Sequence, residues 1–203
     1  YILGKNPSRS IKLSTANKID FDEFVKNINL DFLETGITDQ FKNQIITIAY
    51  VYDFGISEMI SLFNDSINKS GLYDYRLLKK KANLLFNYKK NMRGPILESK
   101  DNDDVTDNDL VNYLENVSPS DFLEDIIPNY PPKYLDIIND IYINIELPRG
   151  VINCMIMKIV KEKAGELPSL KYFQKVSESW IKDNIFSTDV AIKYVTEYKG
   201  KDD

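Results

Sequence analysis

The chain has 203 residues, of which 43% are hydrophobic and 28% are charged, and its net charge is −5. This length fits one domain or two small ones, and the hydrophobic share is sufficient for a packed core. The acidic balance excludes a surface that is basic throughout, although a local basic patch for nucleic acid remains compatible with it.

Several residue types that carry chemistry are missing. The chain has no histidine, which excludes His-based triads and His-ligated metals and removes the commonest general base. The single cysteine, Cys154, lies among apolar neighbours, so we expect a small buried residue. No glycine-rich phosphate loop is present, which argues against an ATPase. We therefore expect no enzyme, no metal site and no cofactor.

The first part of the chain reads as helical after a polar start. Residues 1–19 lack a clear period and predict an extended lead-in. Apolar residues then recur at helical spacing, and Asp20, either Thr38 or Asp39, and Asp74 stand where helix caps are expected. Gly55 is expected to break the second helix. The predicted helices are 20–30, 39–53, 57–69 and one that begins at Asp74, which together form a first module over 20–93.

The second part follows an acidic stretch. Gly94-Pro95 marks a break, and the polar, Asp-rich segment after it cannot bury much surface, so 94–108 is predicted to be a linker. A second module is expected over 109–203. Its helices begin near Asp109, at Ser118-Pro119, at 132–145, at 150–163, at 170–183 and at Thr188. The helix at 150–163 is apolar around much of its circumference and should be the central core helix.

The two modules show a weak internal repeat. Each has a helix, then a core helix, then a triplet with spacing four: Leu78, Ala82 and Phe86 in the first module, and Tyr172, Val176 and Trp180 in the second. Strand-like alternation is absent from the whole sequence. The fold class is therefore predicted as all-α, with two related small helical modules joined by the acidic linker.

The most one-sided charge run is a candidate surface for single-stranded nucleic acid. Aromatic residues are interleaved with it, and cations beside exposed rings suit phosphates and stacked bases. The alternative is a solvated helix face with aromatics in the core. The basic candidates here are Arg76, Lys79, Lys80, Lys81, Lys89, Lys90 and Arg93, and the aromatics are Tyr73, Tyr75, Phe86 and Tyr88.

The second candidate is the triplet Tyr172, Val176 and Trp180. Spacing four places the three side chains on one helical stripe, and core packing is the commoner explanation for such a stripe. Its flanking basic residues are Lys171, Lys175 and Lys182.

Short motifs in order along the chain resemble the DnaD/DnaB family of replication-initiation proteins of low-GC Gram-positive bacteria. The run Leu147-Pro148-Arg149-Gly150-Val151-Ile152-Asn153, followed by the stripe Tyr172-Val176-Trp180, is similar to the family's second homology domain. Leu114-Glu115-Asn116-Val117-Ser118-Pro119 resembles the segment that opens it, and Ile48-Ala49-Tyr50-Val51-Tyr52 resembles the middle region of the DnaB branch. The DnaB branch is closer than DnaD, because Ser177 stands where DnaD carries an arginine.

The resemblance implies a primosomal helicase-loading scaffold rather than an enzyme. Its implied partners are single-stranded DNA, DnaD, the helicase loader ATPase and the replicative helicase, together with further copies of the chain. It implies DNA contact through Tyr172, Val176 and Trp180, and a cytoplasmic protein that is peripherally associated with the membrane. The alternative is a protein–protein interaction module of the primosome that does not itself bind DNA.

Overall fold

The computed structural model describes residues 19–92 and 107–197, and within these ranges every regular element is a helix apart from one isolated bridge between Ile67 and Tyr73. The predicted all-α class is confirmed. Residues 93–106, which include most of the predicted linker, and residues 1–18 of the predicted lead-in lie outside the described ranges. The first group of helices comprises α1 (Phe21–Lys26), the 3-10 turn η1 (Leu30–Phe32), α2 (Asp39–Tyr52), α3 (Ile56–Asp65) and α4 (Tyr75–Met92).

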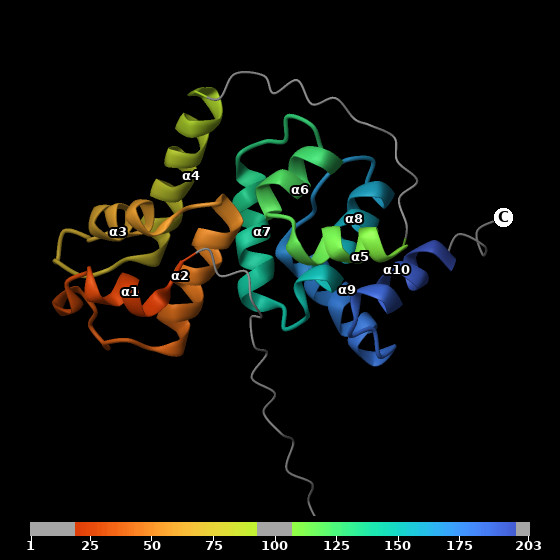
Figure 1. Ribbon diagram of the computed structural model, residues 1–203, viewed down its shortest axis with the longest axis horizontal. Helices are drawn as coiled ribbons and strands as arrows, with labels where there is room; N and C mark the ends of the chain where they lie inside the picture. The colour runs from red at the N-terminus through yellow and green to blue at the C-terminus, as the bar shows by residue number, and fades with distance from the viewer. Residues whose placement is uncertain (1–18, 93–106, 198–203) are drawn as a thin grey trace, which may run out of the picture.

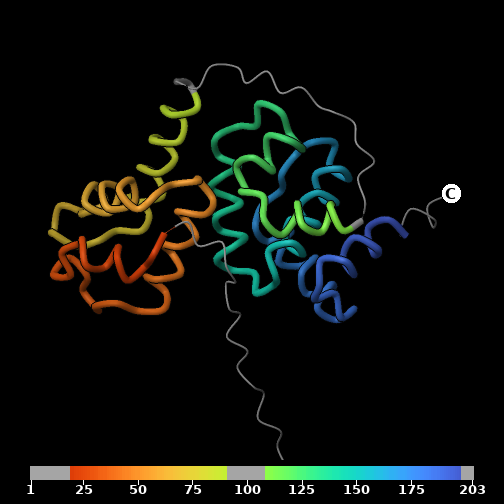
Figure 2. The backbone as a smooth tube through the Cα atoms, viewed as in Figure 1, coloured from red at the N-terminus to blue at the C-terminus, as the bar shows by residue number. Residues whose placement is uncertain are grey.

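The second group comprises α5 (Asp107–Asn116), α6 (Pro119–Ile126), α7 (Lys133–Asn144), α8 (Arg149–Glu162), α9 (Leu170–Lys182) and α10 (Thr188–Glu197). Figure 1 shows the two groups side by side, with α2 and α7 at their junction. The backbone tube in Figure 2 follows the same division. The relation between the two groups as repeats stays a prediction.

Most predicted caps are present. The Asp20 carboxylate accepts hydrogen bonds from two backbone N–H groups of α1, and the Thr38 hydroxyl accepts one from Phe41. The first helix is shorter than predicted, because the Asn27 side chain donates back to the Glu23 carbonyl and closes α1. Gly55 does not end α2. That helix ends at Tyr52, its C-cap Asp53 lies in the left-handed region, and Gly55 instead caps the start of α3.

Two helices, rather than one, form the centre of the core. The predicted core helix is confirmed as α8, which buries Val151, Ile152, Met155 and Ile156. Helix α2 is equally enclosed, since every residue from Gln44 to Tyr52 is buried. It packs against α3 and α4 in its own group and against α6 and α7 in the other. Because α2 has neighbours on several sides, it has no solvent-exposed face between Gln44 and Tyr52, which explains the run of large apolar residues there.

Polar contacts also cross the junction between the groups. The Tyr50 hydroxyl donates to the Val117 carbonyl at 3.1 Å, and the Tyr52 hydroxyl donates to the Asp136 carboxylate at 3.0 Å. Asn139 donates to the Tyr75 hydroxyl from the side of α7. Burial, together with the neighbouring Asp136 carboxylate, raises the pKa of the Tyr52 phenol above its ordinary value, so the hydroxyl stays protonated and keeps donating.

Close approach of three helices requires a glycine at Gly150. A Cβ there would lie 2.2 Å from the Thr188 Oγ1 atom and 2.9 Å from the Glu115 Cγ atom, which is far inside van der Waals contact. The Thr188 hydroxyl in turn donates to the Glu115 carboxylate at 2.8 Å. This point therefore fixes α5, α8 and α10 relative to one another.

Within the described residues no single helix is long and apolar enough to cross a membrane. One sharply bent pair, α2 and α3, meets the length and composition of a span when taken together.

Replacement of Gly150 by Ala should destabilise the fold by about 1–3 kcal/mol, because the added methyl group has no room and its neighbours must shift. Gly55→Ala is the matched control, since its φ is −82° and no heavy atom would lie within 4 Å of the new Cβ. We expect a change of at most about 1 kcal/mol for it, because Gly55 caps α3 and alanine is a poorer N-cap than glycine. Chemical denaturation measures both, and equal midpoints for the two variants would contradict the steric argument.

The Cys154 thiol should be unreactive in the folded chain. It is fully buried, and burial raises its pKa from 9.0 to about 12, so almost no thiolate forms at pH 8. The folded state holds this proton more tightly than the unfolded state, so stability from this group is present below pH 9 and falls as the pH rises toward 12. Labelling with a chromogenic disulfide at pH 8 should therefore follow unfolding, and fast labelling without denaturant would contradict the burial.

Candidate nucleic-acid interface

Helix α4 carries the predicted basic run, and the structure divides it into two faces. The Asp74 carboxylate accepts hydrogen bonds from the Arg76 and Leu77 N–H groups and sets the start of the helix. Leu78 and Ala82 are fully buried, so the side of α4 that carries them faces the core. The basic residues fall partly on the borders of this inner face and partly on the opposite one.

Three of the predicted basic residues are already bound to carboxylates. Each of them reaches across to another helix. Lys79 meets Asp140 of α7 at 2.6 Å, Lys89 meets Glu58 of α3 at 2.5 Å, and Lys90 meets Glu124 of α6 at 2.6 Å. Lys90 also lies over the Tyr130 ring, 4.5 Å from its centroid. These lysines hold α4 to the rest of the protein, and their charges are largely compensated.

The remaining basic residues of α4 face outward. The side chain of Arg76 is 93% exposed and approaches only its neighbour Asp74, at 3.8 Å. Lys80 is exposed and Lys81 half-buried, and neither has an ion pair among the described residues. Leu84 lies on the same face and Tyr88 at its border, with exposed fractions of 56% and 62%. The outward face of α4 is therefore cationic and carries one freely accessible aromatic ring.

The sequence named Tyr88 only as one aromatic among several, and it gave no sign of Leu84. At 100° per residue, Lys80 and Leu84 lie roughly opposite the buried Leu78 and Ala82, whereas Lys81 and Tyr88 lie about 80–100° from them, at the border of the outward face. Arg93 lies outside the described residues. Tyr73, Tyr75 and Phe86 are partly buried against the core, which supports the core interpretation for those three rings.

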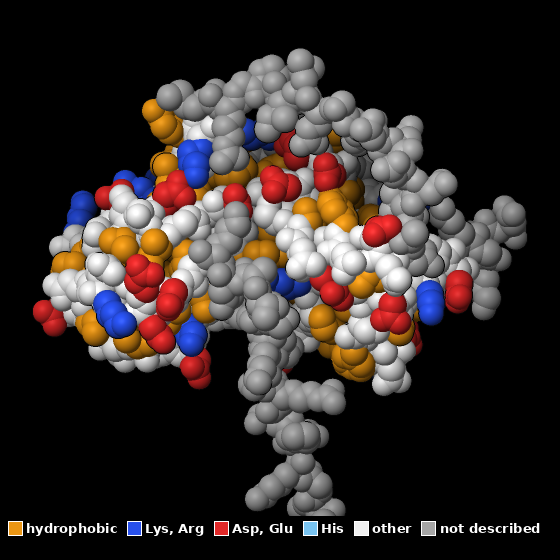
Figure 3. All heavy atoms as spheres, viewed as in Figure 1, with side chains coloured by type: hydrophobic (Ala, Val, Ile, Leu, Met, Phe, Trp, Pro, Cys, Tyr) orange, Lys and Arg blue, Asp and Glu red, His pale blue; other side chains and the backbone are white. Residues whose placement is uncertain are grey.

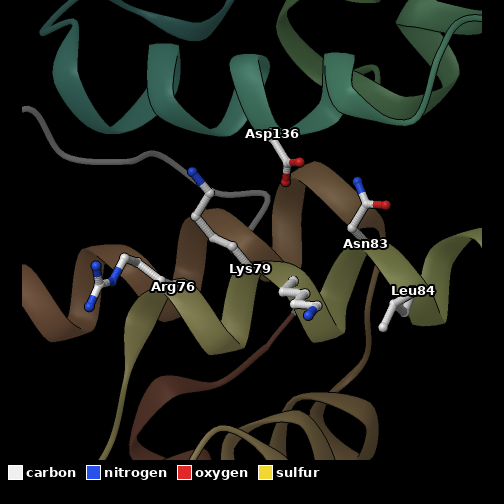
Figure 4. A pocket seen from close by; sticks show the side chains of 6 residues that line it. Arg76, Lys79, Asn83, Leu84 and Asp136 are labelled. Atoms are coloured by element: carbon white, nitrogen blue, oxygen red, sulfur yellow. The ribbon is translucent and has the colours of Figure 1, made fainter.

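An open groove lies between α4 and α7, beside this face (Figure 4). Its volume is about 360 Å³. Lys79 and Asn83 extend from α4 toward α7, whereas Arg76 and Leu84 do not. Burial raises the pKa of the Asp136 carboxyl on the α7 side, although the hydrogen bond from Tyr52 and the charge of Lys79 oppose that shift. The lining residues are Arg76, Lys79, Lys80, Asn83, Leu84 and Asp136.

The stripe on α9 is mainly a packing element. Trp180 is 2% exposed, and its ring lies 5.6 Å from that of Tyr194 in an edge-on arrangement. Tyr172 and Val176 are partly buried against the same core. The Lys163 ammonium group lies 4.9 Å from the Tyr172 ring centroid. Of the three predicted motif residues, only Tyr172 and Val176 are therefore accessible, and neither fully.

The lysines beside this stripe are accessible. Lys171, Lys175 and Lys182 are all exposed, and their spacing puts them on one face of α9, which they share with Glu178. No ion pair is recorded for the three lysines among the described residues. This α9 lysine face, defined by Lys171, Lys175 and Lys182, adjoins Tyr172 and is the second basic surface of the molecule.

The motif residues before α9 have structural roles. The Asn153 amide donates to the Leu114 carbonyl at 2.8 Å, and its oxygen accepts from the Tyr142 hydroxyl at 2.6 Å. Asn153 thus joins α5 and α7 to α8 inside the core, where unsatisfied amide groups would be costly. The Arg149 guanidinium stacks 3.8 Å from the Tyr50 ring centroid and links α8 to α2.

No group of three or more acidic or cysteine residues that could hold a metal ion occurs within 19–92 and 107–197. The candidate interface therefore consists of exposed basic and apolar side chains, and the buried motif residues hold the helices that carry them.

The structure therefore defines an all-α protein in which motif residues such as Asn153 and Arg149 join neighbouring helices. Residues 121–195 match the model of a protein family described as replication initiation and membrane attachment. The match supports the resemblance of this part of the chain to the DnaD/DnaB family. The match covers α7, α8 and α9 completely, and the family is not one of known enzymes. No solved structure matches the chain.

Replacement of Trp180 by Ala should cost about 3–5 kcal/mol, because a large buried ring is removed and leaves a cavity. Tyr172→Ala should cost only about 1 kcal/mol, since its ring is half-exposed and contacts Lys163 through one face. Denaturant midpoints distinguish the two. A Trp180→Ala chain as stable as the parent would show that the stripe does not serve packing.

Proposed function

We propose that this protein is a scaffold of replication initiation that binds single-stranded DNA and helps to place the replicative helicase on it. The outward face of α4 is the observation that carries the DNA-binding part. Arg76, Lys80 and Lys81 provide cations that no other helix within 19–92 and 107–197 neutralises, and Tyr88 presents an exposed ring between them and the end of the helix.

The chemistry of this face suits a single strand. Cations neutralise phosphates and release counterions, whereas an accessible ring stacks on an unpaired base of any identity. A helix of 18 residues is about 27 Å long, which is enough to follow several nucleotides. The inward lysines hold the helix in place, so the face is presented on a rigid element rather than on a loop.

The α9 lysine face is a second contact surface in this proposal. It lies inside the matched family domain, and Tyr172 borders it. The buried Trp180 supports it from behind, because the indole fixes α9 against α10. Tyr172, Val176 and Trp180 therefore act in this proposal by holding and bordering the surface more than by stacking on bases.

Energy for helicase loading comes from a partner in this proposal, since the sequence carries no phosphate-binding loop. The partners are DnaD, the loader ATPase, the replicative helicase and further copies of the chain. Association with the membrane is peripheral. Net charge of −5 favours a second candidate function, namely a protein-interaction module of the primosome that does not bind DNA.

The test is titration of a fluorescent oligothymidylate with the triple variant Arg76→Gln, Lys80→Gln and Lys81→Gln. Loss of three phosphate contacts should weaken binding and lower the slope of log affinity against log salt by about 2. The single substitution Tyr88→Ser, made in the parent chain, should weaken binding by a factor of about five or more relative to the parent. It should leave the salt slope unchanged, because stacking releases no counterions.

The matched control replaces three exposed lysines elsewhere, Lys26, Lys69 and Lys133, by Gln, which alters the net charge equally. It should bind like the parent. If both triple variants lost DNA affinity equally, the loss would follow from net charge alone and would contradict a specific role of the α4 face. No binding by the parent at low salt, with retained binding to DnaD or the loader, would select the protein-interaction module.

A further inference from the structure

Large apolar side chains gather at the turn between α9 and α10. Ile181 lies in the last turn of α9, Phe186 lies in the connection, and Val190 lies in the first turn of α10, with exposed fractions of 42%, 47% and 40%. These three residues define the α9–α10 tip. The two helices meet at the lower right edge of the molecule in Figure 1, and Figure 3 shows apolar side chains on that edge.

Buried side chains anchor the α9–α10 tip to the core. Trp180, Ile185 and Ala191 alternate with its exposed residues and are almost completely buried. The Ile185 N–H donates to the Trp180 carbonyl at 2.9 Å, and Asn184 takes the left-handed conformation that lets the chain turn, with φ of 60°. The exposure of Ile181, Phe186 and Val190 is therefore a property of a well-anchored turn and not of a loosely packed end.

Charges around the tip balance. Lys182 and Lys193 are exposed near it, and so are Asp183 and Asp189. The Ser187 hydroxyl hydrogen bond lowers the pKa of the exposed Asp189 carboxyl, which keeps it ionised. A ligand that binds here gains little from net charge, so its affinity must come from apolar contact.

We propose that the α9–α10 tip inserts into the interfacial region of a lipid bilayer. The tip lies inside residues 121–195, the segment that matches a family described by membrane attachment, and the inference rests on the membrane part of the proposed function. Exposed Phe, Ile and Val side chains are of the kind that an interfacial segment buries at the boundary between headgroups and acyl chains. A turn anchored by a buried indole presents them without unfolding.

Flotation with phosphatidylcholine vesicles tests the insertion. The variant Ile181→Ser with Phe186→Ser should lower the partition coefficient of the chain about tenfold or more, because two half-exposed apolar side chains no longer leave water. Leu30→Ser with Ile37→Ser is a closely matched control, since those side chains are 43% and 47% exposed and lie in the other helix group. The control should float like the parent.

A spectroscopic readout accompanies flotation. In a Phe186→Trp chain, fluorescence should shift to shorter wavelength on addition of vesicles and be quenched by brominated acyl chains, whereas Ile37→Trp should show neither effect. The native Trp180 is buried in both and gives a constant background.

The outcomes separate the tip from membrane association in general. Equal loss in both serine pairs, or flotation of the parent that survives the tip pair, overturns the tip while leaving membrane association intact. A parent that does not float overturns both, and DNA titration of the same chain still decides the DNA-binding proposal. Flotation only with anionic phosphatidylglycerol vesicles would indicate adsorption through lysines and overturn the insertion. A tip pair that changes sedimentation but not flotation assigns the surface to a second copy.

Discussion

Enclosure of α2 is the constraint on which the arrangement of the whole protein depends. Because this helix is buried from Gln44 to Tyr52, it cannot be satisfied by the first helix group alone, and α6 and α7 must cover its remaining side. The phenols of Tyr50 and Tyr52 then meet acceptors in the second group, and Arg149 stacks on Tyr50. The candidate surfaces on α4 and α9 are presented by helices that this junction holds in place.

Helix α4 shows how one charge run serves two purposes. Lys79, Lys89 and Lys90 reach carboxylates on three different helices, whereas Arg76 and Lys80 meet none of them. Partly exposed ion pairs of this kind contribute little stability each, typically about 0–1 kcal/mol. Their main effect is orientation, because three separate anchor points leave α4 only one way to face. The accessible charges and the Tyr88 ring lie on the side that remains.

The sequence predicted the helical class and most helix starts because these depend on local periodicity and capping, as at Asp20, Thr38 and Asp74. It predicted α8 as a core helix because its apolar residues surround the axis. It did not predict that α2 is equally central, since enclosure depends on α6 and α7, which lie far away in the chain. For the same reason it could not tell which lysines of α4 find acids: Asp140 lies 61 positions after Lys79. The stripe Tyr172-Val176-Trp180 was found correctly as a pattern, but only the structure shows that its Trp180 faces the core.

The three lysine anchors of α4 also have a mechanical consequence. They end on α3, on α6 and on α7, so they tie the helix to both helix groups at once. A nucleic-acid strand that pulls on α4 would therefore load several attachments in parallel, and the force would pass into both groups rather than peel one helix from the surface. In the proposed complex with single-stranded DNA, tension on the strand would therefore be transmitted to the junction that α2 fills.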